Sequence, residues 1–357
     1  MLRVGMLTSG GDCQALNAAM RGVAKFLYNN VKEVEIIGIE DGYYGLIYGQ
    51  SHVMNRSEFS GILTQGGTII GTSRQPFKYM RVADENGTDK VKAMVDNYKK
   101  MKLDCIVILG GNGTHKTANL LYENGLNVVT LPKTIDNDLY GTDVSFGFQS
   151  AVDIAANTID CIHTTAASHS RVFIIELMGH KTGWLTLYAG IAGGADIILI
   201  PEIPYDIKAV SEAIKKRAAA GKEFTIMAVA EGIISKEEAK LSKKELKEAR
   251  KNDNFPSAAY RLGKQIEELT GHEVRVTVPG HVQRGGTPCA YDRVLATRLG
   301  AKAGELIINK EFGYMATFTN NKIGKIALKE VAGKTKMVDP KDPLVLRAKA
   351  LGLCLGD

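Results

Sequence analysis

The sequence predicts an α/β protein with mainly parallel sheets. Short apolar runs of strand length recur along the chain, loops rich in glycine or polar residues follow them directly, and helical periodicity follows several of these loops. This alternation of strand, loop and helix is typical of a doubly wound parallel sheet. The chain has 357 residues, which is more than one domain usually contains, so we expect two domains or one enlarged α/β domain.

Composition and charge favour a protein of the cytoplasm that binds an anionic small molecule. Hydrophobic content of 45% and charged content of 24% are ordinary for globular proteins. The net charge of +6 is mild, and the Lys and Arg residues are interspersed with Glu and Asp, which favours an anionic small molecule over nucleic acid as the ligand. A protein surface with a slight surplus of lysine explains the same charge equally well. Neither a signal peptide nor an apolar run of membrane-spanning length is present, so we expect no secretion and no membrane insertion. The five cysteines form no C-x-x-C pair, which predicts a reduced protein without a zinc site.

The first strand and glycine loop begin at the N-terminus. The apolar run Leu2–Leu7 ends at Thr8–Asp12, and a helical pattern follows. This predicts a phosphate loop of moderate specificity, because it matches neither the Walker pattern nor G-x-G-x-x-G. After a second strand, Val34–Ile39, the glycine-rich loop Gly66–Arg74 carries one arginine. Arg74 either bridges donor phosphates or is a solvated surface residue.

Two later loops carry the residues best suited to chemistry. Gly110–Thr114 follows an apolar run, and its glycines would let a phosphate approach the N-terminus of a helix predicted from about His115. Leu131–Gly141 follows the next apolar run and contains Asp136 and Asp138 with one Lys and one Thr. Each loop alone fits an ordinary strand-to-helix turn. Together, at neighbouring strand ends, they predict a phosphate cradle facing a general base.

The second half of the chain repeats this organisation. Four apolar runs are each followed by polar residues: Val172–Leu177, Ile197–Ile200, Phe224–Ala230 and Arg275–Val278. We therefore expect two sheets whose carboxyl ends face each other across a cleft. The stretch 235–254 is dense in Lys and Glu and predicts a solvated helix, 315–336 is turn-rich, and the chain ends in the apolar stretch Leu351–Leu355.

The chain resembles the phosphofructokinases over nearly its whole length. The matching segments, in the family's order, are Leu7–Asp12, Asp41–Tyr43, Gly66–Thr68, Gly110–Thr114, Thr134–Asp138, Met178–Gly179 and Gly280–Gly286. The resemblance implies two Rossmann-like domains with an active-site cleft between them. The implied domains are a larger ATP-binding domain, residues 1–147 and 283–332, and a smaller fructose 6-phosphate-binding domain, residues 148–282 and 333–357.

The implied reaction is transfer of a phosphoryl group from ATP, with Mg²⁺, to the 1-hydroxyl of fructose 6-phosphate in glycolysis. Asp136 is expected to be the general base, with Asp138 holding charge or metal and Thr134 lining the phosphoryl path. The expected donor-binding residues are Gly11, Arg74, Gln75, Gly111, Asn112, Gly113 and Thr114, of which Gly11 is also expected to be catalytic and Asn112 to be the metal ligand.

The sugar phosphate is expected to contact residues from both halves of the chain. These residues are Thr134, Asp136, Arg171, Met178, Gly179, His180, Glu231, Arg275, His281 and Arg284. Arg171, Arg275, His281 and Arg284 would hold the 6-phosphate, because a dianion favours several charge-assisted donors. By resemblance, Arg171 and Arg275 reach in from a neighbouring subunit, which implies a homo-oligomer, either a homotetramer or a homodimer.

Three departures from the family pattern concern the donor and the effector site. Asn112 stands where the family usually has an Asp associated with magnesium, and its amide oxygen can coordinate only without charge. Lys133 is shared with the pyrophosphate-dependent enzymes, whereas Gly113 is the residue of the ATP enzymes, so the combination resembles the family's mixed group. Gly113 favours ATP because an Asp there would crowd and repel the α-phosphate. By resemblance, His163 and Ala220 stand where regulated bacterial members carry basic effector-site residues, although Arg21, Lys25 and Lys222 keep some positive charge, which leaves effector control open.

Two alternatives remain open, and two others are disfavoured. The donor could be pyrophosphate, or the protein could be a catalytically weak paralogue that senses sugar phosphate, as Asn112 allows. Kinases acting on NAD or lipids share a Gly-Gly-x-Gly-Thr loop, but they would not explain His281–Gly286. A dehydrogenase is disfavoured because G-x-G-x-x-G is missing from the first turn.

Overall fold

Two units, each with its own parallel sheet, make up the chain. Unit 1 comprises Met1–Ser150 and Arg284–Lys336, and unit 2 comprises Ala151–Gln283 and Met337–Asp357. The computed structural model describes residues 1–251 and 254–357. The two sheets confirm the predicted fold class, an α/β protein with two mainly parallel sheets. The domain boundaries expected from the sequence lie a few residues from this division and remain predictions.

Unit 1 contains a seven-stranded sheet in the order β11-β10-β5-β4-β1-β2-β3. Its inner strands pair in parallel, and only the edge pairs β10–β11 and β2–β3 are antiparallel. The strands are β1 (Leu2–Ser9), β2 (Val34–Ile39), β3 (Ser51–Met54), β4 (Cys105–Gly110), β5 (Val128–Pro132), β10 (Tyr314–Thr319) and β11 (Lys322–Ala327). The central strands are buried along nearly their whole length, as expected for parallel strands covered on both faces.

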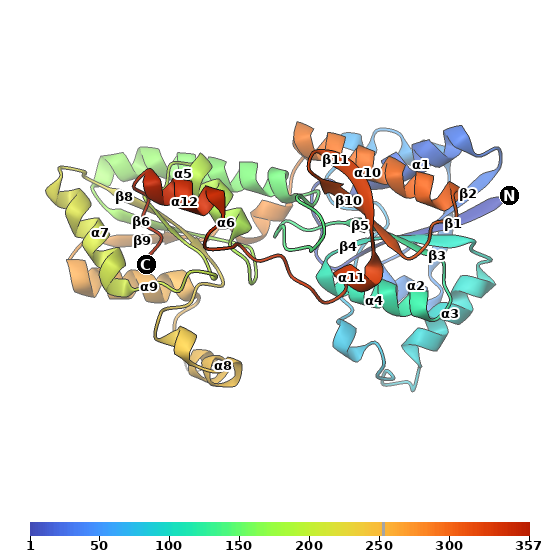
Figure 1. Ribbon diagram of the computed structural model, residues 1–357, viewed down its shortest axis with the longest axis horizontal. Coiled ribbons are helices and arrows are strands. Elements are labelled where there is room, and N and C mark those ends of the chain that lie inside the picture. Colours follow the sequence, from blue (N-terminus) through green and yellow to red (C-terminus); the bar gives the residue numbers. More distant parts are fainter. Residues whose placement is uncertain (252–253) are drawn as a thin grey trace. The chain divides into compact units, whose positions relative to one another are not determined.

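Helices cover both faces of this sheet (Figure 1). On one face, α1 (Leu16–Asn30) packs along α10 (Ala290–Ile308), and Gly22 and Gly300 let their backbones approach so closely that a Cβ on either would clash. The other face carries α2 (Tyr43–Tyr48), α3 (Lys90–Lys100), α4 (Asn112–Glu123) and α11 (Leu328–Val331). Short 3₁₀ turns complete the unit at Arg56–Phe59, Ile62–Thr64 and Phe77–Tyr79.

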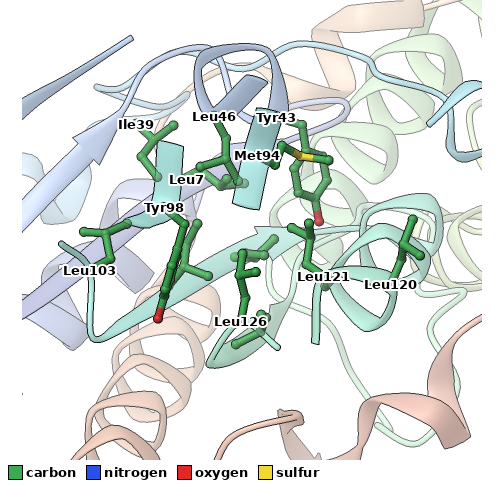
Figure 2. Close-up of a cluster of buried hydrophobic side chains, with 14 of the residues drawn as sticks. Leu7, Ile39, Tyr43, Leu46, Met94, Tyr98, Leu103, Leu120, Leu121 and Leu126 are labelled. Atoms are coloured by element: carbon green, nitrogen blue, oxygen red, sulfur yellow. The ribbon is translucent and has the colours of Figure 1, made fainter. Parts of the chain in front are cut away.

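The core on this second face reaches the predicted donor loop. Leu7, Leu46, Met94 and Leu121 are among its fully buried side chains (Figure 2). Tyr43 lies in the same cluster, and its hydroxyl donates a hydrogen bond to the carbonyl of Thr114 at 2.8 Å. The core therefore holds the first turn of α4 in place through a buried polar contact.

Unit 2 contains a four-stranded, wholly parallel sheet in the order β7-β8-β6-β9. The strands are β6 (Val172–Leu177), β7 (Ile197–Leu199), β8 (Thr225–Ala230) and β9 (Val274–Thr277). The helices are α5 (Phe148–His169), α6 (Trp184–Ala192), α7 (Ile207–Ala219), α8 (Lys243–Lys251), α9 (Ala258–Thr270) and α12 (Pro343–Ala350), with 3₁₀ turns at Glu238–Lys240 and Gly280–Arg284. Helices α7 and α9 share one buried face of the sheet, and α5 and α12 lie on the other (Figure 1).

One sequence prediction about elements was wrong. The predicted helix over 235–254 is a 3₁₀ turn followed by α8, because Ser242 and Glu245 form a capping box that starts a new helix. Its end, Asn252 and Asp253, lies outside the described residues. The turn-rich stretch 315–336 contains the β10–β11 hairpin, whose turn residues Asn320 and Asn321 have φ values of 51° and 60°.

In the described part of the chain, no helix combines the length and apolarity needed to cross a membrane.

Candidate functional site

The predicted donor loops of unit 1 lie at the switch point of its sheet. From β1 the chain passes to β2 on one side, and β4 later pairs with β1 on the other side. The loops after β1 and β4 therefore leave neighbouring carboxyl ends, with Ser9 in register with Gly110. This edge is where open α/β sheets bind ligands.

The donor helix α4 begins at Asn112, three residues before the predicted start at His115. Gly113 and Thr114 consequently lie in its first turn, where backbone N–H groups lack intrahelical partners and favour anions. Gly113 is exposed, its φ is not in the left-handed region, and an added Cβ would meet no atom within 4 Å. The fold itself therefore does not require glycine at this position.

His115 supports the donor loop, a role that sequence analysis missed. Its Nδ1 lies 2.8 Å from the carbonyl oxygen of Gly111, so the Nδ1–H tautomer donates to that carbonyl. Burial lowers the pKa of His115 to about 4, which keeps the ring neutral at neutral pH. Nothing in the sequence around His115 distinguishes it from an ordinary helical residue, so this contact could not be predicted.

Two cations converge on the first glycine loop. Lys133 is almost fully buried, and its Nζ donates to the carbonyl of Gly11. Arg284 Nη1 donates to the carbonyl of Asp12 at 3.0 Å, and a Cβ on Gly11 would lie 2.7 Å from the same Nη1. Burial lowers the pKa of Lys133, with the nearby Arg284 charge acting in the same direction. A side chain at position 11 would therefore displace the Arg284 guanidinium from its present position.

The predicted catalytic loop alternates between buried and partly exposed residues. Ile135, Asn137 and Leu139 are buried, whereas Asp136 and Asp138 are partly exposed. The Asp136 N–H donates to Thr134 Oγ1 at 3.0 Å. The buried residues anchor the loop, and the two acidic residues between them stay partly exposed, although Asp136 Oδ1 is itself buried.

Asn137 sets the shape of this loop, and sequence analysis did not assign it a role. Its φ is 51°, a left-handed conformation that Asn tolerates better than most residues. Its Oδ1 accepts from Ser145 N at 3.1 Å, and its Nδ2 donates to the carbonyl of Asp143 at 3.2 Å. The only sequence signal was an Asn between two acids.

In unit 2, residues from three strand ends come together. The Met178 N–H, after β6, donates to Gln283 Oε1 at 3.2 Å, and the His180 N–H donates to Glu231 Oε1, after β8, at 2.7 Å. Gly179 has a φ of 145° and a Cβ there would lie 2.5 Å from the carbonyl oxygen of Thr182. His180 and Glu231 are exposed, and so is His281 in the turn after β9.

Arg171 and Arg275 lie at the other end of this sheet. Arg171 precedes β6 and Glu273 precedes β9, at the amino ends of adjacent parallel strands. Arg171 Nε lies 2.5 Å from Glu273 Oε2, and Arg275 Nη2 contacts Glu273 Oε1. The paired guanidinium of Arg171 is the main cause of the lowered pKa of the Glu273 carboxyl. Six residues of β6 separate Arg171 from Met178, a span of about 20 Å.

The remaining expected donor residues are accessible. Arg74 is exposed and forms no ion pair with a described residue, and Gln75 is partly exposed. Asn112 donates through Nδ2 to the carbonyl of Lys334, while its Oδ1 is buried and lacks a hydrogen-bond partner among residues 1–251 and 254–357. Over that same range, no three His, Cys, Asp or Glu side chains gather closely enough to hold a metal ion.

The positions tied to effector control line two separate cavities. Ala220 and Lys222 line one of about 780 Å³ in unit 2, and Arg21 and Lys25 line one of about 310 Å³ in unit 1. His163 Nε2 lies 2.7 Å from the carbonyl oxygen of Gly193. Effector control remains open.

The comparison with protein families decides the identity of the fold. The phosphofructokinase family model matches residues 3–307, most of the chain. The chain belongs to the phosphofructokinase family. Its curated relatives include the ATP-dependent 6-phosphofructokinase of Spirochaeta thermophila, 55% identical over 99% of this chain and 97% of the relative. ATP-dependent 6-phosphofructokinase 3 of Bacteroides thetaiotaomicron is 47% identical over 99% of this chain and 100% of the relative.

Solved phosphofructokinase structures share this fold. The phosphofructokinase of Saccharomyces cerevisiae superposes with a TM-score of 0.79 and 31% identity, over 92% of this chain and 45% of the yeast chain. This chain thus spans less than half the length of the yeast subunit. The pyrophosphate-dependent phosphofructokinase of Nitrosospira multiformis superposes with a TM-score of 0.82 over 99% of this chain and 92% of the other, at 19% identity, which supports the fold alone.

Proposed function

We propose that this phosphofructokinase transfers a phosphoryl group from ATP to the 1-hydroxyl of fructose 6-phosphate, as a cytoplasmic enzyme of glycolysis. The observation that carries the proposal is the pairing of an open helix N-terminus at Gly113 with a carboxylate loop on the neighbouring strand. Gly110, at the end of β4, is in register with Pro132, at the end of β5. The residues that follow these two positions carry the donor-binding N–H groups and Asp136 respectively.

In this mechanism Asp136 accepts the proton of the attacking hydroxyl, and Thr134 and Asp138 flank it. Phosphoryl transfer needs an aligned nucleophile and electrostatic support more than covalent chemistry. The first turn of α4 supplies N–H groups to the donor phosphates, and the buried Lys133 adds positive charge beside the Gly11 loop. The 6-phosphate is held by the cationic residues Arg171, Arg275, His281 and Arg284.

The residues present fit a magnesium ion carried mainly by the donor. Mg²⁺ keeps several waters and takes few protein ligands when it binds substrate phosphates. Asn112 Oδ1, buried and without a hydrogen-bond partner among the described residues, could supply one neutral oxygen, and the Asp136 and Asp138 carboxylates could supply charge. The ion would neutralise charge on the transferring phosphoryl group.

ATP is the preferred donor because of the space at Gly113. No protein atom lies within 4 Å of where its Cβ would be, so that volume can take the α-phosphate of a nucleotide. Pyrophosphate is the second candidate, because Lys133 is a buried cation that could neutralise either donor. The names of the relatives at 55% and 47% identity support ATP.

The arginine positions support an oligomer, a homotetramer or a homodimer. Arg171 and Arg275 lie at the amino ends of β6 and β9, and Met178 and Glu231 lie just past the carboxyl ends of β6 and β8. The two arginines and the pair Met178 and Glu231 can bind the same molecule of fructose 6-phosphate if they come from different subunits. A mixture of Asp136→Asn and Arg275→Ala chains, refolded together, should then regain activity at low fructose 6-phosphate. No gain over the separate variants would contradict shared sites.

A coupled assay of the purified protein tests the function directly. We expect turnover of fructose 6-phosphate with Mg-ATP and little with pyrophosphate. Efficient turnover with pyrophosphate alone would reverse the choice of donor. Binding of fructose 6-phosphate without turnover by either donor would favour a sugar-phosphate sensor.

A further inference from the structure

A short segment of unit 1, Lys334–Lys336, contacts both reactive loops, and we call it the strap. On one side, the Asn112 side-chain amide at the start of α4 donates to the carbonyl of Lys334 at 2.7 Å and to Thr335 Oγ1 at 3.1 Å. On the other side, Thr335 forms an antiparallel bridge with Leu139. The strap thus lies between the donor helix and the loop that carries Asp136.

Lys336 ties the strap to the catalytic loop through three hydrogen bonds. Its N–H donates to the carbonyl of Asp138 at 2.8 Å. Its Nζ donates to the carbonyls of Thr142 at 2.9 Å and Asp143 at 2.7 Å. The Thr142 hydroxyl in turn accepts from the N–H of Phe318 in β10 at 3.0 Å, so this turn is also fixed to the sheet.

The strap also gives a physical reason for the amide at position 112. An Asp has no donor, so its carboxylate would face the Lys334 carbonyl oxygen and repel it. The amide of Asn112 instead donates twice to the strap through its nitrogen. Asn and Asp are therefore not interchangeable here, because only the amide can donate these two hydrogen bonds.

We propose that the strap aligns the donor helix with the catalytic loop, and that Asn112 and Lys336 are positioning residues for phosphoryl transfer. The proposal rests on the proposed function, because that reaction requires the donor phosphate and Asp136 to be aligned. The strap belongs to unit 1, whereas Arg171 and Arg275, the predicted phosphate-binding arginines at the amino ends of β6 and β9, belong to unit 2. Loosening it should therefore lower kcat without weakening fructose 6-phosphate binding.

The first test compares Lys336 with a lysine outside the strap. Lys336→Met removes the ammonium that holds the turn, and we expect kcat to fall about 10- to 100-fold with an unchanged KM for fructose 6-phosphate. The matched control is Lys329→Met, which removes the exposed ammonium of a lysine in α11. The control should behave like wild type.

The second test uses the exposed Thr335, where substitutions should not prevent folding. Thr335→Val removes the oxygen that accepts from Asn112, and Thr335→Ser keeps it. We expect the Val variant to raise the KM for ATP several-fold, because α4 loses a contact, and the Ser variant to restore wild-type values.

Hydrogen exchange of amides 134–143 gives a readout that does not depend on activity. Faster exchange in Lys336→Met than in Lys329→Met supports the strap. If Lys336→Met and Thr335→Val both match their controls in kcat, KM and exchange, the strap positions nothing. If the wild type turns over no fructose 6-phosphate, the proposed function fails, and the exchange comparison still decides whether the strap orders the loop.

Discussion

The two units hold their predicted site residues in opposite ways. In unit 1, Lys133, His115 and Asn137 are buried and bonded to the backbone of the loops that carry the glycines and carboxylates. In unit 2, His281 and Arg275 are exposed side chains. The geometry of the unit 1 site is therefore fixed by buried contacts within the fold, whereas in unit 2 the side chain of Arg275 is held by an exposed ion pair with Glu273.

The largest expected effect is at the carboxylate of unit 1. Asp136→Asn keeps the shape of the loop but removes the base, so kcat should fall by about 10² or more. Fructose 6-phosphate binding, measured by calorimetry, should stay close to wild type. A variant that retains most of its turnover would remove Asp136 from the role of base.

The donor loop should show the next largest effect. Gly113→Asp fits the fold, because no atom lies within 4 Å of its Cβ, but it places a carboxylate where the α-phosphate is expected. We expect kcat/KM for ATP to fall about 100-fold, the effect of about 3 kcal/mol of repulsion and lost space. Thermal unfolding should be unchanged, and activity with pyrophosphate should not fall. Equal losses with both donors would show that the site had been damaged generally.

The burial of His115 in unit 1 should make the stability of the protein depend on pH. Its pKa is about 4 in the folded chain against 6.5 as the ordinary value. The unfolded chain therefore binds a proton at His115 below about pH 6.5, whereas the folded chain binds it only below about pH 4. The free energy of unfolding consequently falls as the pH drops through this window. Between pH 7 and pH 5 we expect a loss of about 2 kcal/mol from this residue.

The check is denaturant unfolding at both pH values and one protein concentration. His115→Asn keeps a donor for the Gly111 carbonyl and should lose this part of the pH dependence. The control His169→Gln changes an exposed ring and should keep it. Equal pH dependence in wild type and His115→Asn would contradict a buried neutral ring.

The smallest effect is expected in unit 2. Arg275 is exposed and already paired with Glu273, so replacing it removes one screened contact of several to the phosphate. Arg275→Ala should raise the KM for fructose 6-phosphate about 10-fold and barely change that for ATP. Equal changes for both substrates would count against a role at the 6-phosphate.

The sequence by itself determined the central parallel strands and the order of the loops that follow them. Parallel strands buried on both faces give continuous apolar runs, and glycine or acidic residues mark their ends, so β1, β4, β5 and β6 were predicted to within a few residues. The paired acids at 136 and 138 were found for the same reason. Apolar runs and the glycine or acidic residues that end them are patterns among neighbouring residues, so they can be recognised in the sequence alone.

Only the tertiary structure decided which distant residues shape the site. Asn112 and Lys334 are 222 residues apart, Lys133 and Gly11 are 122 apart, and both pairs form hydrogen bonds. A Lys, an Asn or a His has the same appearance in sequence whether it is solvated or buried. Its partners, and with them its charge and its role, follow from the packing of elements that the chain brings together over such distances.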